Sequence, residues 1–171
     1  KILDNNIKNK ISVIAEIKKA SPSAGIIINE YKPIEIAREY YINGATCLSI
    51  LTEQKFFYGK LEHIKEVKDE IKLPVLCKDF FIDTFQIPLV KSFGADAILI
   101  ILSALDKNLA EEIYLCANEY NMSTIVEVHT ADEAEYALNF KEALIGINNR
   151  NLKTLKTNIN TTYDLYKIIS E

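Results

Sequence analysis

Two ionisable residues stand inside an apolar segment near the start of this chain. Glu16 and Lys18 follow Val13-Ile14-Ala15 and are separated by one isoleucine. Alternation along a β-strand places residues i and i+2 on one face, so both side chains point the same way. Burying either charge is costly unless it is paired or used in chemistry. The segment therefore predicts a buried strand that delivers two charges to its carboxyl end, with a strand fraying into a solvated surface as the plainer alternative.

The residues that follow cannot continue this strand. The stretch 19–25 contains Pro22, which lacks an N–H donor, and ends at Gly25, whose backbone is unrestricted. We expect a flexible polar loop there. A buried strand that ends in charges and opens into such a loop is typical of a reaction centre, because binding and catalytic residues concentrate on loops held by a rigid scaffold.

Charged and amide side chains recur at the ends of later apolar segments. They are Lys78 in segment 74–80, Glu127 in 123–129, Asn148 at the end of 143–148, and Arg150 just after that segment. Together with Glu16 and Lys18, these residues could act as acids and bases, because neighbouring ionisable groups can be held in different protonation states. Lysines and an arginine also suit an anionic substrate, because a guanidinium binds a carboxylate or phosphate bidentately. Each residue alone could instead be a rim charge or half of a structural ion pair.

Six short apolar segments alternate with amphipathic ones along the chain. We expect strands at 13–17, 45–51, 74–80, 95–102, 123–129 and 143–148, and helices at 33–43, 61–71, 84–93, 107–120, 130–139 and 161–169. Asp106 and the pair Thr130 and Glu133 provide capping signals, and Gly44 and Gly94 follow two of the helices. Near-continuous apolar strands alternating with helices predict an α/β fold with a parallel sheet covered by helices.

Two architectures fit this order of elements, an open doubly wound sheet and a (β/α)8 TIM barrel. The doubly wound sheet predicts a G-x-G-x-x-G turn after the first strand, which the stretch 21–25 lacks. A barrel draws its working residues from the ends of several strands, as this sequence does. A full barrel needs about 250 residues. We therefore expect a single, partial TIM-barrel domain over residues 1–171, with about six βα units and without strands seven and eight.

The composition argues against several classes of partner. The net charge is -4 and basic residues are scattered, which predicts neither a nucleic-acid surface nor a polybasic membrane anchor. No apolar run reaches the roughly 18 residues that span a bilayer. Cys47, Cys77 and Cys116 lie in apolar segments without metal-ligand spacing, which predicts a reducing cytoplasm. His63 and His129 are far apart in sequence with no evident carboxylate or thiol cluster, so we expect no metal site.

Five sequence blocks, in this order, closely resemble the indole-3-glycerol phosphate synthase family. They are E-x-K-x-x-S-P from Glu16, S-I-L-T-E-x-x-F-F-x-G from Ser49, K-D-F from Lys78, V-E-V-H from Val126 and G-I-N-N-R-N-L from Gly146. The resemblance covers the chain from about residue 12 to its end. It implies a (β/α)8 barrel of tryptophan biosynthesis. The family converts 1-(2-carboxyphenylamino)-1-deoxyribulose 5-phosphate to indole-3-glycerol phosphate, carbon dioxide and water, without a cofactor.

The resemblance also implies roles for individual residues. Lys78 matches the general acid that protonates the ribulose carbonyl as the aromatic ring attacks it, and Glu127 matches the general base. Glu16 matches a carboxylate that assists dehydration, and Lys18 a lysine that holds a substrate anion and shares the proton transfers. The implied substrate-binding residues are Ser21 in a mobile first loop with Pro22, Phe57 and Leu99 against the anthranilate ring, and Asn148 and Arg150. Packing alone is the alternative for Phe57 and Leu99.

Two other functions remain open at this point. One is another phosphate-binding barrel in which Lys78 forms a Schiff base, as aldolases do. The other is an inactive fragment that keeps these residues by descent, because strands seven and eight carry the phosphate site of this fold. We expect the missing strands, and most of the segment before residue 12, to come from a longer protein or another chain. The expected partner is the phosphorylated small-molecule substrate, and the oligomeric state is open.

Overall fold

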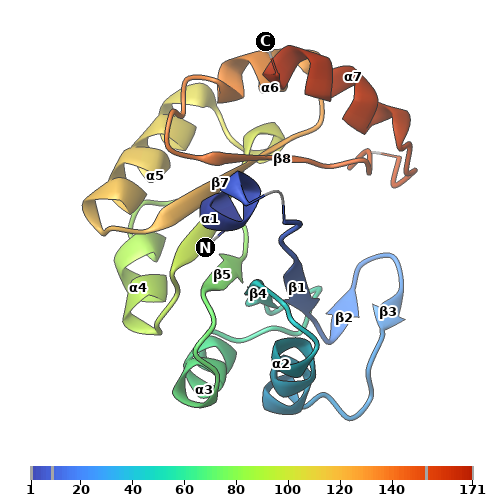
Figure 1. Cartoon of the computed structure of the whole chain (residues 1–171), viewed down its shortest axis with the longest axis vertical. Helices are drawn as coiled ribbons and strands as arrows, with labels where there is room; N and C mark the ends of the chain where they lie inside the picture. The colour runs from blue at the N-terminus through green and yellow to red at the C-terminus, as the bar shows by residue number, and fades with distance from the viewer. Residues whose placement is uncertain (1, 9, 153, 171) are drawn as a thin grey trace. The chain divides into compact units, whose positions relative to one another are not determined.

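The structure is a computed structural model that describes residues 2–8, 10–152 and 154–170 (Figure 1). Its elements are α1 (Ile2–Ile7), β1 (Ile14–Ile17), β2 (Ala20–Ser21), β3 (Gly25–Ile26), α2 (Pro33–Ile42), β4 (Cys47–Leu51), α3 (Glu62–Glu70), β5 (Val75–Lys78), α4 (Gln86–Ser92), β6 (Ala97–Ile101), the 3-10 helix η1 (Leu102–Ala104), α5 (Lys107–Glu119), β7 (Ser123–Val128), α6 (Ala131–Ala137), β8 (Leu144–Ile147) and α7 (Asn160–Ile169). The six predicted strands are β1 and β4 to β8, and the six predicted helices are α2 to α7. Within the described ranges, every helix is too short or too polar to span a bilayer.

The chain divides into two compact units. The first comprises Lys1–Asp79 and Pro88–Ala97, and the second Phe80–Ile87 and Ile98–Glu171. Most of α4 therefore belongs to the first unit and most of β6 to the second. The expectation of a single partial barrel domain stays a prediction.

The first unit is built on parallel strands in the order β1-β4-β5. The register places Glu16 beside Ser49 and Lys78 beside Leu51. Strand β4 is buried along its whole length because it is paired on both sides, whereas β1 is half-buried except at Ile17. Helices α2 and α3 pack against each other and against β1 and β5 (Figure 1). Because the strands are parallel, their carboxyl ends lie at one edge of the sheet.

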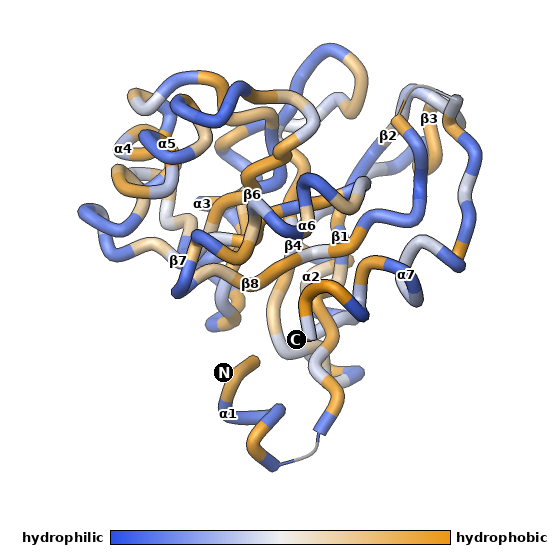
Figure 2. The backbone as a smooth tube through the Cα atoms, turned by 90° about the horizontal axis from the view of Figure 1, so that it is seen from above, coloured by the Kyte–Doolittle hydropathy of each residue, from blue (hydrophilic) through white to orange (hydrophobic). Residues whose placement is uncertain are grey.

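The second unit has the strand order β6-β7-β8. Strands β7 and β8 are parallel, with Glu127 beside Gly146. Helices α5 and α6 pack on β7, and α7 packs on β8 and α6 (Figure 1). The tube in Figure 2 is coloured hydrophobic along β6 and β8. Both units confirm the predicted α/β fold of parallel strands covered by helices.

The predicted caps form at the starts of two helices in the second unit. Asp106 Oδ1 accepts a hydrogen bond from the backbone N–H of Leu109 at 2.9 Å, which satisfies a free donor at the start of α5. Thr130 Oγ1 accepts one from the N–H of Glu133 at 3.3 Å at the start of α6. Gly44, which follows α2, has φ +87°, a conformation that side chains with a Cβ rarely adopt. These local signals explain why the predicted helix boundaries lie close to the observed ones.

The stretch after β1 differs from the predicted flexible loop. It forms a small antiparallel hairpin, β2-β3, in which Ala20 pairs with Ile26 and Ser21 with Gly25. Pro22 lies in the turn, where its missing N–H removes no ladder bond, and Gly25 has φ +65°. The sequence analysis also did not predict α1, a helix of six residues that buries none of its side chains.

Candidate active site

The first unit gathers three predicted site residues around one carboxylate. Glu16 Oε1 lies 2.6 Å from Lys18 Nζ, and Glu16 Oε2 lies 3.6 Å from Lys78 Nζ. All three side chains are 30% to 36% exposed, so the cluster is open to solvent and to a ligand. Strand alternation predicted that Glu16 and Lys18 share a face, and in the structure Lys78 from the end of β5 joins them. The cluster places two ammonium groups beside one carboxylate, which are groups able to bind an anion and to exchange protons.

Tyr40 and Ser49 are neighbours of this cluster. The hydroxyl of Tyr40 donates to the backbone oxygen of Glu16 at 3.1 Å, which ties the end of β1 to α2. Ser49 lies beside Glu16 in the register of β1 and β4. Its Oγ is buried and has no hydrogen-bond partner among the residues that the structure describes. Buried polar atoms are usually bonded, so this hydroxyl is an exception beside the cluster.

The K-D-F block is anchored through the residue after Lys78. Thr52 Oγ1 donates to Asp79 Oδ2 at 2.5 Å and lies 3.3 Å from Cys77 Sγ. Burial raises the pKa of Cys77 to about 12; the Thr52 hydrogen bond lowers it in part, and the Asp79 charge raises it further. The Cys77 thiol therefore stays protonated at neutral pH and is not a nucleophile.

The loop after β4 is organised by a single carboxylate. Glu53 Oε1 accepts from the N–H of Lys55 at 2.8 Å, and Oε2 accepts from Phe56 at 2.8 Å and Phe57 at 3.1 Å. Burial alone would raise the pKa of Glu53, but these backbone hydrogen bonds and the charge of Lys55 outweigh it and lower the pKa. The conformation that presents Phe57 thus depends on an ionised Glu53.

Gly59 closes the same loop against the end of β4. A Cβ at this position would lie 2.3 Å from the carbonyl oxygen of Leu51 and 2.7 Å from the Cα of Thr52, both backbone atoms. Only glycine fits here without a backbone shift, which gives the F-F-x-G block a steric basis. Phe57 is half-buried, whereas Phe56 is 52% exposed. Contact of Phe57 with a substrate ring stays a prediction.

The second unit brings together Glu127 and Asn148. Glu127 is 9% exposed on β7, and Asn148 Nδ2 donates to its Oε1 at 2.9 Å. The backbone N–H of Asn148 extends the pairing of β8 by donating to the oxygen of Val128 at 3.0 Å. Asn148 Oδ1 in turn accepts from the N–H of Arg150 at 2.9 Å. Asn148 therefore orients the Glu127 carboxylate and the start of the next loop.

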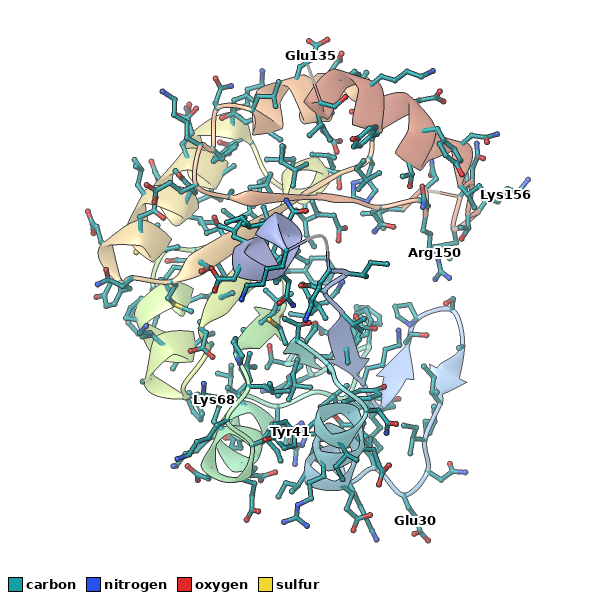
Figure 3. The ribbon with its side chains drawn as sticks, in the orientation of Figure 1. Glu30, Tyr41, Lys68, Glu135, Arg150 and Lys156 are labelled. Carbon is teal, nitrogen blue, oxygen red and sulfur yellow. The ribbon has the colours of Figure 1, made fainter. Side chains whose placement is uncertain are left out.

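The loop that carries Arg150 is tied to α7. Asn149 Oδ1 accepts from the N–H and the hydroxyl of Thr162, at 3.0 and 2.8 Å. Arg150 forms an isolated antiparallel bridge with Thr157. In Figure 3, Arg150 and Lys156 lie on this loop between β8 and α7. Asn149 is a supporting residue that the sequence did not single out, although it stands inside the G-I-N-N-R-N-L block.

His129 is a second residue that the sequence did not assign. Its Nε2 lies 3.4 Å from Glu127 Oε1, and its Nδ1 lies 3.4 Å from Glu133 Oε2. The expectation that neither histidine has a carboxylate cluster is therefore wrong for His129. The physical reason is that Glu127 precedes it by two positions on the same strand face, while the first turn of α6 brings Glu133 back over the end of β7.

The two remaining predicted residues serve local structure. Leu99 is 3% exposed within β6. Ser21 Oγ accepts from the N–H of Ala24 at 3.3 Å, which closes the turn of the β2-β3 hairpin. Their contacts with a substrate stay predictions.

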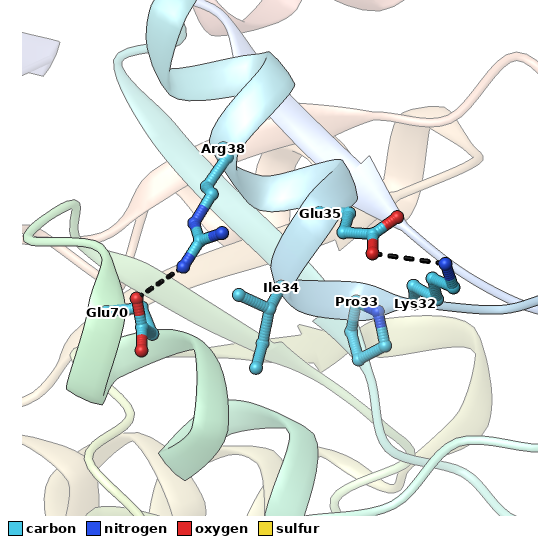
Figure 4. A pocket seen from close by; sticks show the side chains of 6 residues that line it. All are labelled: Lys32, Pro33, Ile34, Glu35, Arg38 and Glu70. Atoms are coloured by element: carbon cyan, nitrogen blue, oxygen red, sulfur yellow. Dashed lines mark hydrogen bonds and ion pairs between the residues drawn. The ribbon is translucent and has the colours of Figure 1, made fainter.

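The surface also holds a hollow of about 380 Å³ beside α2 (Figure 4). Its charged side chains pair with one another: Arg38 Nη2 lies 2.7 Å from Glu70 Oε2, and Lys32 Nζ lies 3.2 Å from Glu35 Oε1. Pro33 and Ile34 complete its lining, and none of the lining residues is a predicted site residue. Because its charges are already paired, this hollow is a weaker candidate than the strand-end clusters.

Comparisons with known proteins point to one family. The profile of the family described as indole-3-glycerol phosphate synthase matches residues 1–171. The chain is 47% identical over 158 residues to the enzyme of that name from Burkholderia ambifaria, and 48% identical over 160 residues to that from Zymomonas mobilis subsp. pomaceae. The alignments cover 92% and 94% of this chain but 60% and 61% of the relatives, so the chain spans about 60% of their length.

A solved structure of 3-hexulose-6-phosphate synthase resembles this chain with a TM-score of 0.68. The match covers 93% of this chain and 76% of the other, at 13% sequence identity. At that identity the likeness shows the fold alone. It supports an α/β fold consistent with part of a TIM barrel rather than a doubly wound sheet.

Proposed function

The chain belongs to the indole-3-glycerol phosphate synthase family, and we propose that it carries the acid–base residues of that family's reaction. The proposed reaction is the decarboxylating ring closure of 1-(2-carboxyphenylamino)-1-deoxyribulose 5-phosphate to indole-3-glycerol phosphate, carbon dioxide and water. The observation that carries this proposal is the Lys18–Glu16–Lys78 cluster, with separations of 2.6 and 3.6 Å. Its two ammonium groups and its carboxylate suit an anionic substrate that needs proton transfer.

Lys78 is the proposed general acid. Its ammonium group donates a proton to the ribulose carbonyl oxygen as the aromatic ring attacks the carbonyl carbon. Glu16, at 3.6 Å, stabilises the protonated lysine and afterwards assists loss of the hydroxyl group as water. Lys18 holds a substrate anion and shares these proton transfers. Groups of this kind contribute about 10² to 10⁴-fold each when they are correctly placed.

Glu127 is the proposed general base, which removes a proton from the ring-closed intermediate after carbon dioxide has left. Its burial and its hydrogen bond from Asn148 support this role, because they orient one carboxylate in a largely dry setting. Arg150, whose backbone N–H donates to Asn148, is the proposed ligand of a substrate anion. Ser21, Phe57 and Leu99 are the other proposed substrate contacts.

The proposed complete fold is a (β/α)8 TIM barrel, of which this chain supplies six βα units. Strands seven and eight would complete the sheet and supply the phosphate site. Cys47, Cys77 and Cys116 are free cysteines, which supports a reducing cytoplasm as the proposed compartment. The proposed partner is the phosphorylated small-molecule substrate alone, without a cofactor, nucleic acid or membrane.

The test is an assay for indole-3-glycerol phosphate by its fluorescence, with the natural-length protein that carries this sequence beside the 171-residue chain. Lys78→Ala should reduce kcat by about 10² to 10⁴-fold. Lys72→Ala, an exposed lysine six positions earlier, is the matched control and should leave turnover unchanged. Absence of turnover from a folded protein of natural length would refute the proposal.

Borohydride distinguishes the proposed reaction from the aldolase alternative. A Schiff base between Lys78 and a keto substrate would be reduced to a stable adduct, detectable by mass spectrometry at that residue. The proposed acid role forms no covalent bond to the lysine, so we expect no adduct. A Lys78 adduct together with absent ring closure would favour the aldolase.

A further inference from the structure

We propose that Tyr40 is a positioning residue that fixes the Glu16 carboxylate beside Lys18 and Lys78. This inference rests on the proposed function, because it assigns a support to the proposed acid–base cluster. It comes from one hydrogen bond within the first unit, in which the hydroxyl of Tyr40 donates to the backbone oxygen of Glu16 at 3.1 Å. Tyr40 belongs to none of the five sequence blocks that suggested the family.

This hydrogen bond lies on the outer side of strand β1. Among the described residues, β1 ends its sheet and has β4 as its one neighbouring strand. The oxygen of Val13, just before β1, accepts from the backbone N–H groups of Thr46 and Cys47 at 2.9 and 3.2 Å, so this carbonyl points towards β4. Carbonyl groups alternate between the two sides of a strand, so that of Glu16, three positions later, points away from β4. Tyr40 thus binds a backbone group of the kind that an edge strand leaves exposed.

Fixing this carbonyl also fixes the direction of the Glu16 side chain. The carbonyl belongs to the planar peptide that joins Glu16 to Ile17, and rotation of that peptide turns the backbone that carries the carboxylate. The carboxylate lies 2.6 Å from Lys18 Nζ and 3.6 Å from Lys78 Nζ. A misplacement of about 1 Å at a reacting group can cost about 10²-fold in rate. The hydrogen bond is therefore placed where a small loss of order would separate Glu16 from Lys78.

Helix α2 gives the Tyr40 hydroxyl a firm base. The helix begins at Pro33, whose fixed φ suits a first helical position, and it buries Ala37 completely. Arg38 Nη2 lies 2.7 Å from Glu70 Oε2, which joins α2 to α3 (Figure 4). Tyr40 is half-buried two positions later, and its side chain has few torsions to restrict. The hydrogen bond therefore ties β1 to a helix that is itself held against its neighbours.

The amino end of β1 carries a comparable bond that involves no proposed site residue. The backbone N–H of Val13 donates to Thr46 Oγ1 at 3.2 Å. Thr46 is 7% exposed, and valine would keep its shape while removing the hydroxyl. Thr46 therefore provides a structural comparison, because it makes a side-chain hydroxyl bond to the same chain segment at the end away from the cluster.

Two other roles for Tyr40 predict different results. In the first, Tyr40 donates a proton to the substrate. Its hydroxyl has one proton, which the Glu16 carbonyl already receives, so this role and the observed bond exclude each other. In the second, Tyr40 only stabilises the fold, as Thr46 does. That role predicts a loss of stability without a selective effect on a reaction that uses Glu16.

The first experiment needs no substrate and measures amide hydrogen exchange in the natural-length protein. A hydrogen bond shifts an opening equilibrium by about fivefold, so Tyr40→Phe should raise the exchange rate of the buried Ile17 amide by about that factor. Tyr41→Phe is the matched control, because Tyr41 is the next residue of α2 and is 55% exposed (Figure 3). It should leave the exchange rate unchanged. Unchanged exchange in Tyr40→Phe would overturn the positioning role without touching the proposed function.

The second experiment measures kcat and KM for indole-3-glycerol phosphate formation. Tyr40→Phe should lower kcat about tenfold with KM changed less than about threefold, because Tyr40 positions a reacting group and touches no substrate. Thr46→Val and Tyr41→Phe should change kcat less than about twofold. The selective test repeats Tyr40→Phe in a Glu16→Gln protein, whose residual rate is followed in single turnovers. There it should lower the rate less than about twofold, because residues that act through one group are not additive.

Each of the other outcomes decides against one part of the argument. A full tenfold loss in the Glu16→Gln protein would show that Tyr40 acts through some other group. Equal losses of kcat in Tyr40→Phe and Thr46→Val would reduce Tyr40 to a structural support. Absent turnover in the unmodified natural-length protein would instead refute the proposed function, and the exchange experiment would still decide whether Tyr40 holds the end of β1.

Discussion

Replacing Glu53 with glutamine should loosen the loop between β4 and α3. The carboxylate accepts three backbone N–H bonds of 2.8, 2.8 and 3.1 Å. Glutamine keeps one oxygen acceptor. Its NH₂ group is itself a donor and cannot accept a hydrogen bond from the remaining backbone N–H groups. Side-chain caps of this kind contribute about 0.5–2 kcal/mol, and solvent around this exposed loop limits the gain from the charge. We therefore expect Glu53→Gln to lower the free energy of unfolding by about 1–2 kcal/mol at neutral pH.

The effect should depend on pH with a definite sign. The hydrogen bonds lower the pKa of Glu53 in the folded chain, so the folded state favours the ionised form. Its stabilisation is complete above the pKa of an unfolded glutamate, about 4.3, and is lost as the pH falls through the lower folded value. The difference between the unmodified protein and Glu53→Gln should thus be constant near neutrality and shrink below about pH 4.

Urea unfolding and amide hydrogen exchange, each followed from pH 3 to pH 7, provide the assay. The exchange rates of the Lys55, Phe56 and Phe57 amides should rise in Glu53→Gln even if global unfolding changes little. Glu30→Gln is the control, because Glu30 projects from a loop into solvent (Figure 3). A stability difference that persists unchanged at pH 3, or exchange rates equal to those of the control, would contradict the role of an ionised Glu53.

Two further predictions concern the same unit. Gly59→Ala should lower the free energy of unfolding by about 3 kcal/mol, because the new Cβ would lie 2.3 Å from the Leu51 carbonyl oxygen and the backbone must move. Gly44→Ala should lower it by only about 1 kcal/mol, because φ there is +87° but nothing lies within 4 Å of the new Cβ. Equal losses of stability for the two variants in urea unfolding would contradict this steric argument. Cys77, with its pKa raised to about 12 by burial, should resist iodoacetamide at pH 8 until the chain unfolds, as followed by mass spectrometry. Rapid labelling of the folded chain would show that this thiol is more exposed than the structure indicates.

Elements whose signals are local were predictable from the sequence. Strand β4 lies in a run with no charged residue, and Asp106 and Thr130 cap the helices that follow them. The meeting of Glu16 with Lys18 followed from strand alternation alone. The meeting of Glu16 with Lys78 needed one more step, that β1 and β5 flank β4 in parallel. Strand alternation and helix caps can be predicted from the sequence because each depends on residues only a few positions apart.

The β2-β3 hairpin could not be predicted in the same way. Its strands are two residues long, so no alternation of apolar and polar residues can be read from them. Pro22 and Gly25 suggest a loop by type, yet the same residues fit a tight turn between paired strands. Whether a loop or a hairpin forms depends on whether the backbone on one side of the turn pairs with the backbone on the other side. The residue types do not reveal this pairing.

His129 was missed for a reason that applies beyond this chain. In the sequence, Glu133 is the third residue of a helix capped by Thr130. This capping role accounts for Glu133 without any contact to His129. However, a carboxylate in that position folds back over the residue before the cap, and here that residue is a histidine at the end of a strand. Strand alternation puts the same histidine on the face of Glu127. A titratable residue just before a capped helix, two positions after a strand carboxylate, therefore predicts an acid–imidazole–acid arrangement from sequence alone.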